Sequence, residues 1–196
     1  MRLGLAMYFA VVVASVTPIA SGGTQPASPS ATMHPAARVI AALLGSVHRD
    51  AADSMLVVRD STLRFTLPAR PTMSRWRASY DSFPERLVRA LARESERVRS
   101  IHEVPLPRRF HPLSTAEQRA IFAGGVDRGW REFERRFPGV RAFYQFSPVV
   151  FNADSSEALI YYHYHCGGLC GGGSLVLVRR EGATWRVRQI LQFWIS

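Results

Sequence analysis

Both cysteines of this 196-residue chain lie four positions apart near its C-terminal end, as Cys166 and Cys170. Two glycines and a leucine separate them, and glycine frees the backbone to bring two sulfurs together. In an oxidising compartment such a pair forms a disulfide, worth about 2 kcal/mol for so small a ring. We therefore predict a disulfide that fixes the shape of a turn. A redox-active pair is the alternative, although the spacing is not that of a CxxC motif.

Two histidines, His163 and His165, stand directly before the first cysteine. With Cys166 and Cys170 they make four side chains of the kind that binds zinc. On a strand, His163 and His165 share one face, whereas Cys166 points to the opposite face. This geometry favours histidines that pack against neighbours such as Tyr161, and we predict no metal and no cofactor.

Other catalytic patterns are missing from the sequence. The glycines of 167–173 fit neither GxGxxG nor a phosphate loop with lysine, and no GxSxG elbow occurs. The acids Asp154, Glu157 and Glu181 fall near predicted turns, where solvated carboxylates are common. We nominate no catalytic residue and expect a binding or structural role. The alternative is a thiol-redox or metal-dependent enzyme that uses the histidines and cysteines described above.

The C-terminal residues resemble a known pattern. It comprises Trp130–Phe133, Phe137–Gly139, Phe146-Ser147, Phe151-Asn152, Ala158–Tyr161, Cys166–Gly171, Trp185–Val187 and Trp194–Ser196. The chain looks like a loosely defined set of uncharacterised exported bacterial proteins that end in a CGxLCGxG hairpin and a W-x-V…W-I-S strand. The resemblance covers about 70 residues, counted from Gly129, and implies no activity. The closing strands also resemble the sheet of cystatin-like or NTF2-like domains, which host both enzymes and binding modules.

The elements around the cysteines read as an antiparallel meander. We predict strands at 144–151, 157–166, 174–180 and 184–195, with turns at 152–154 and 181–183. Pro148 indicates an edge or a bulge in the first strand. Aromatic residues are dense on the first two strands, and they could form a core or line a small apolar pocket.

Three helices are predicted upstream. The first covers 36–48, and Val39, Ile40, Leu43, Leu44 and Val47 form its apolar stripe. The second begins near Ser82, which has capping-box spacing to Glu85, and its apolar face is Leu87, Val88, Leu91 and Val98. The third runs from a capping box at Ser114 and Glu117 to Pro138, with a stripe of Phe122, Val126, Trp130, Phe133 and Phe137. Its glycines at 124, 125 and 129 are expected to bend it or allow close packing.

Residues 55–58 and 63–67 read as two short strands or one bent strand, and 68–81 and 104–113 as irregular connections. Helices followed by a run of strands predict an α+β fold, with helices on one face of a curved antiparallel sheet.

The N-terminal residues read as an export signal. Arg2 precedes the apolar run 3–16, which is short for a membrane span, and small residues at 20–22 suit a signal peptidase. We predict a signal peptide at 1–22, a disordered leader at 23–34 and one domain at 35–196. The protein would then be periplasmic or extracellular, with no transmembrane segment after cleavage.

The net charge of the chain indicates which classes of partner it could bind. The net charge is +10, the sequence contains no lysine, and all 25 basic residues are arginines. Schiff-base chemistry is therefore excluded. The charge suits an anionic envelope component, such as phosphorylated lipid or acidic polymer, or a small ligand, although a merely solvated basic surface is the alternative. Nucleic acid is disfavoured because the arginines are dispersed and no recognised motif is present.

Overall fold

The computed structural model describes residues 33–47, 55–66 and 83–196. These residues form an α+β fold, as predicted. Its helices are α1 (Pro35–Val47), α3 (Glu85–Glu96), α4 (Thr115–Phe122) and α5 (Val126–Arg136), with a short 3-10 helix, η3 (Ile101–Glu103). Its strands are β1 (Leu56–Arg59), β2 (Phe110–Leu113), β3 (Phe143–Phe146), β4 (Val150–Phe151), β5 (Glu157–Gly167), β6 (Cys170–Glu181) and β7 (Thr184–Ile195).

The strands form one seven-stranded sheet in the order β2-β1-β3-β5-β6-β7, and β4 pairs with β5 beyond the end of β3. The antiparallel meander from β3 to β7 confirms the prediction for the C-terminal part. The sheet as a whole is mixed, however, because β1 runs parallel to both β2 and β3. Parallel pairing joins segments far apart in the sequence, and local patterns do not reveal it.

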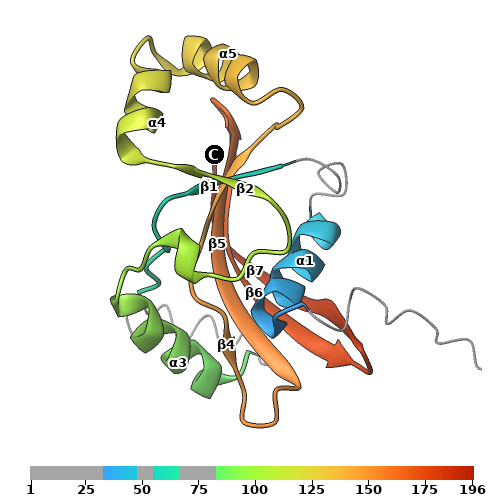
Figure 1. Cartoon of the computed structure of the whole chain (residues 1–196). Helices are drawn as coiled ribbons and strands as arrows, with labels where there is room; N and C mark the ends of the chain where they lie inside the picture. The colour runs from blue at the N-terminus through green and yellow to red at the C-terminus, as the bar shows by residue number, and fades with distance from the viewer. Residues whose placement is uncertain (1–32, 48–54, 67–82) are drawn as a thin grey trace, which may run out of the picture. The chain divides into compact units, whose positions relative to one another are not determined.

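Helices α1 and α3 cover opposite faces of the sheet (Figure 1), so the prediction of helices on one face was wrong. Helix α1 contributes Val39, Ile40, Leu43 and Leu44 to one core cluster, and the first three are fully buried. Helix α3 contributes Leu87, Val88 and Leu91 to the other. The residues of β5 alternate between the two clusters, as the pleat of a strand requires. Most of its aromatics are buried in these clusters, and those of β3 are buried in the first of them or in a third cluster, so these side chains form core.

The third predicted helix is two helices, α4 and α5. Gly125 between them has a φ of 91°, a conformation that glycine adopts readily and that ends a helix. Gly129 lies against the ring of Phe122, which a Cβ at 129 would strike, so close packing is confirmed as its role. Phe122, Trp130, Phe133 and Phe137 pack in a third cluster with Phe143 of β3, whereas Val126 is 54% exposed.

Two predictions about strands were wrong. Residues 63–66 belong to no strand: Leu63 N–H donates to the Phe146 carbonyl of β3 (2.8 Å), but Phe65 N–H donates to the buried Ser95 hydroxyl of α3 (3.0 Å), so the pairing does not continue. Their alternation reflects burial of Phe65. The connection 104–113 ends in β2, which contains Pro112. Proline is tolerated there since β2 is at the edge of the sheet.

The start of one helix, α3, differs from prediction, whereas the starts of α1 and α4 agree with it. Helix α3 begins at Glu85, with Pro84 at its N-cap and no side-chain cap, and Val98 lies beyond its end and is exposed. In α4, Ser114 accepts a hydrogen bond from Glu117 N–H (3.0 Å), as the capping box predicts. The Glu117 carboxylate, however, contacts His111 Nε2 (2.9 Å). Helix α1 begins as predicted, and His34 Nδ1 accepts from Ala36 N–H (3.2 Å).

The predictions for 1–22 and 68–81, and nearly all of the leader at 23–34, lie outside the described residues, as do Ser82 and His48. Among the helices that are described, none is long and apolar enough to cross a membrane.

Candidate functional site

The predicted disulfide is present. Cys166 and Cys170 are bonded to each other at the turn between β5 and β6, with their Cα atoms 5.0 Å apart. The register shifts by one residue between His165 and Gly167, so that Gly167 pairs with Cys170 and two residues, Gly168 and Leu169, form the turn. The disulfide therefore closes the hairpin at its tip and holds the two strand ends together.

The structure does not bring the histidines and cysteines into one site. Cys166 packs with the cluster under α1. His163 contacts Tyr161, which belongs to the cluster under α3, so it lies on the opposite face of β5, as predicted from strand geometry. In the described parts of the chain, no three histidine, cysteine or acidic side chains are grouped so that they could hold a metal ion.

His163 lies in a hydrogen-bonded cluster with Tyr161 and Trp194. Its Nε2 is 2.8 Å from the Tyr161 hydroxyl and 3.2 Å from Trp194 Nε1. An indole N–H can only donate, so Nε2 accepts and the proton of the neutral imidazole is on Nδ1. The Trp194 ring also lies against His165, which stacks on Phe143. These contacts fasten the end of β7 to β5 across β6.

The environment keeps both histidines neutral. Burial, with a smaller contribution from nearby His165, lowers the pKa of His163 to about 4. Burial and the Arg59 guanidinium lower the pKa of His165. A proton on His163 Nε2 would also face the Trp194 N–H, which is itself a donor. The cluster can therefore stabilise the sheet at neutral pH but cannot act there as a protonated acid.

The hairpin glycines provide space, a role that differs from the predicted backbone freedom. Gly167 and Gly168 do not have the positive φ that is found at Gly125, Gly139 and Gly182. At Gly173, a Cβ would strike the Trp194 indole and the His163 ring (2.8 Å from Cδ2). At Gly172, it would lie 2.9 Å from the Tyr164 ring. The run of glycines lets large side chains from both neighbouring strands cross over β6.

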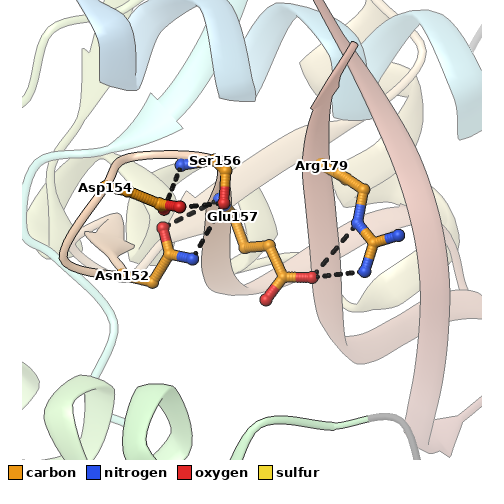
Figure 2. A network of polar contacts seen from close by, with 5 residues as sticks. All are labelled: Asn152, Asp154, Ser156, Glu157 and Arg179. Atoms are coloured by element: carbon orange, nitrogen blue, oxygen red, sulfur yellow. Dashed lines mark hydrogen bonds and ion pairs between the residues drawn. The ribbon is translucent and has the colours of Figure 1, made fainter.

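The predicted carboxylates at 152–157 make structural contacts (Figure 2). Asp154 Oδ1 accepts from the Ser156 N–H (3.0 Å) and hydroxyl (2.7 Å), and these two bonds lower the pKa of Asp154. Asn152 Oδ1 accepts from Glu157 N–H (2.9 Å). Glu157 in turn accepts from Arg179 Nη2 across the strands (2.7 Å). Hydrogen bonds therefore hold this turn closed and fix the start of β5.

A second site, which the sequence did not predict, lies between α4 and α5. A hollow of about 660 Å³ opens there, lined by Ala120, Ile121, Ala123, Gly124, Arg128, Arg131, Glu132 and Arg135. The three arginines recur at i, i+3 and i+7 and so share one face of α5. That face is the one opposite the buried Phe133. The lining carries three positive charges and one negative charge, a net of +2.

The single carboxylate in the lining of this hollow, Glu132, forms ion pairs with arginines. Glu132 accepts two bonds from Arg135, Nε to Oε2 (2.8 Å) and Nη2 to Oε1 (2.7 Å), and one from Arg136 Nε (2.7 Å). These contacts, the Arg135 bonds foremost, lower the pKa of Glu132 to about 2. Among the described residues, Arg128 and Arg131 have no ion-pair partner, so both guanidinium groups can bind an anion.

The sequence pattern does not reveal this hollow, because it predicts one continuous helix over 114–137 and marks only the aromatic stripe of that helix. The available signal was the spacing of Arg128, Arg131 and Arg135 after Gly124-Gly125. Only the break at the glycines turns α4 back over α5 and creates a concave surface.

No protein-family model, curated protein or solved structure matches the chain. The resemblance to exported proteins with a CGxLCGxG hairpin therefore stays a prediction.

Proposed function

We propose that this protein is an exported, non-enzymatic domain that binds a phosphate-bearing ligand in the hollow between α4 and α5. The observation that carries the proposal is the pair Arg128 and Arg131, which line the hollow and have no ion-pair partner within the described ranges. Guanidinium groups form paired, charge-assisted hydrogen bonds with phosphate oxygens. A lining with a net charge of +2 matches a phosphate monoester, which carries nearly two negative charges at neutral pH.

The hollow also has space for a ligand, and its one carboxylate is paired. Ala120, Ala123 and Gly124 are small, and they leave room for a ligand beside the arginine side chains. Because Glu132 is bound by Arg135 and Arg136, it repels an anion less than an isolated carboxylate would.

The alternative hypothesis is an enzyme that uses the histidines and cysteines of the C-terminal hairpin. The contacts of these residues support a scaffold role instead. The cysteines are bonded to each other, and His163 is engaged by Tyr161 and Trp194. Export, which the N-terminal pattern predicts, would place the protein among phosphorylated and acidic envelope components and in a compartment that maintains the disulfide.

The test is a calorimetric titration of the purified protein with glycerol 3-phosphate. We expect Arg128→Gln/Arg131→Gln to weaken binding by about tenfold or more, because two charge-assisted contacts are lost. The matched control is Arg86→Gln/Arg93→Gln on α3, which removes the same charge from two exposed arginines away from the hollow. Equal weakening in both double variants would contradict a defined site and leave only general attraction to a basic protein.

A further inference from the structure

A row of polar side chains crosses the sheet between the cluster under α3 and the third cluster, which α4 and α5 cover (Figure 1). Phe143 of the third cluster stacks on His165 of β5. Two positions away on the same two strands, and therefore on the same face, Gln145 is aligned with His163. Arg59 continues the row at the end of β1. Arg59, Gln145 and His163, the polar row, are half-buried, whereas the clusters on both sides are buried.

Arg59 is a half-buried cation whose hydrogen bonds are incomplete. It follows two residues after Val57 of the third cluster, so its side chain shares that face of the sheet. Its Nη2 donates to the Thr115 hydroxyl of α4 (2.7 Å), but its Nε–H is shielded from solvent and meets no acceptor in the described ranges. No carboxylate of those ranges forms an ion pair with it either. An anion that binds this guanidinium would supply both the acceptor and the charge that are missing.

His163 presents a second donor toward the same part of the sheet. Its Cδ2 faces β6, since a Cβ on Gly173 would lie 2.8 Å from it. Its Nε2 is held by the contacts described above, so the proton is on Nδ1. Because Nδ1 lies across the ring from Cδ2, the Nδ1–H faces β3 and Gln145. Arg59 and His163 therefore offer N–H groups from the two strands on either side of Gln145.

We infer that a small aromatic carboxylate binds over Gln145, between Arg59 and His163. This site does not depend on the phosphate site proposed above. Two strand spacings, about 10 Å, separate β1 from β5, and an arginine and a histidine side chain can both reach an anion within that interval. Gln145 Nε2 donates one hydrogen to the Ser61 carbonyl (3.2 Å), which fixes the amide and leaves its second N–H as a further donor.

The charge of the polar row selects a monoanion. Arg59 carries one positive charge, whereas burial lowers the pKa of His163 to about 4 and so keeps it neutral at pH 7. A carboxylate carries one negative charge and only accepts hydrogen bonds, which suits a site made of donors. A phosphate monoester, with nearly two charges, fits the arginines of the hollow better.

The neighbours of the polar row favour an aromatic group on that carboxylate. The rings of His165 and Trp194 lie against each other beside the row, with centroids 5.7 Å apart. Both side chains are half-buried, so part of each ring is open to a ligand. A planar ring can pack on them while its carboxylate meets Arg59.

The experiment is a calorimetric titration of the purified protein with benzoate, with benzamide as the uncharged counterpart. We expect Arg59→Gln to weaken benzoate binding by about tenfold or more, because a charge-assisted contact is lost. Arg109→Gln is the matched control, since it removes the same charge from an exposed residue near the other end of the β1–β2 pair. Thr115→Val removes the hydrogen bond to α4 but keeps the Arg59 charge, and benzoate should bind it as it binds the unaltered protein.

Three results would overturn the inference: no binding of benzoate, equal binding of benzamide, or equal weakening in Arg59→Gln and Arg109→Gln. If Arg59→Gln does not fold, nuclear magnetic resonance of the Arg59 Nε–H in the unaltered protein decides. A shift that saturates with benzoate supports the site, and an unchanged signal contradicts it. The two proposals stay separable, because benzoate and glycerol 3-phosphate should bind together. Competition between them would place benzoate in the hollow and overturn this inference alone.

Discussion

At the scale of single residues, His163 makes the fold sensitive to acid. The pKa of His163 is about 4 in the folded protein, below its ordinary value of 6.5, which applies to the unfolded chain. As the pH falls, the unfolded chain therefore binds a proton before the folded protein does. The contribution of His163 to stability is therefore fully present above pH 6.5 and is lost as the pH falls from 6.5 to 4. With allowance for the part of the ring that is exposed to solvent, the loss is about 1 to 2 kcal/mol.

Denaturant unfolding at pH 7 and pH 4.5 measures this loss. We expect the unaltered protein to lose about 1 to 2 kcal/mol more than His163→Gln over that interval, since glutamine does not titrate. Carboxylates shared by both proteins cancel in the comparison. An identical loss in the two proteins would show that His163 does not couple folding to pH.

Gly173 is the residue at which added volume should be least tolerated. A Cβ there would strike Trp194 and His163, so Gly173→Ala should lower the free energy of unfolding by about 1 to 3 kcal/mol. Gly45 of α1 is the matched control, because nothing lies within 4 Å of its Cβ position. Gly45→Ala should raise stability by up to about 1 kcal/mol. Chemical denaturation distinguishes the two, and equal effects would refute a spacing role for Gly173.

At the scale of elements, local sequence patterns predicted the strands, the turns and the disulfide, because these depend on residues close together in the chain. Alternation and turn residues located β5, β6 and β7, and the cysteine spacing located the disulfide. The parallel contacts of β1 could not be read in this way, because they join residues far apart in the chain. The hollow between α4 and α5 could not be predicted from the sequence for a related reason. It depends on the break at Gly125, which decides how α4 and α5 face each other.

Within α5, Glu132 should moderate the affinity of the hollow. Glu132→Gln removes its one negative charge, raises the net charge of the lining from +2 to +3, and releases Arg135. Glycerol 3-phosphate should then bind several-fold more tightly, since the one negative charge of the lining is removed. Calorimetry of Glu132→Gln beside Glu134→Gln, the same charge change at an exposed residue outside the lining, tests this. An equal gain in both variants would point to net charge alone.

At the scale of the whole molecule, the described residues divide into a scaffold and the end at which we propose that an anion binds. The sheet, with α1 and α3 on its two faces, forms two of the three core clusters. Helices α4 and α5 and the hairpin tip gather near one end of β5 (Figure 1). The histidine cluster joins these parts, because it fastens β7 beside the hairpin that contacts Val126.

We propose that an anion binds at Arg128 and Arg131. The most direct measurement is nuclear magnetic resonance of the arginine Nε–H groups during titration with glycerol 3-phosphate, because it reports the position of the ligand. We predict that the Arg128 and Arg131 signals shift and saturate, while those of Arg86 and Arg93 stay in place. Small, unsaturated shifts at all four arginines alike would contradict the account.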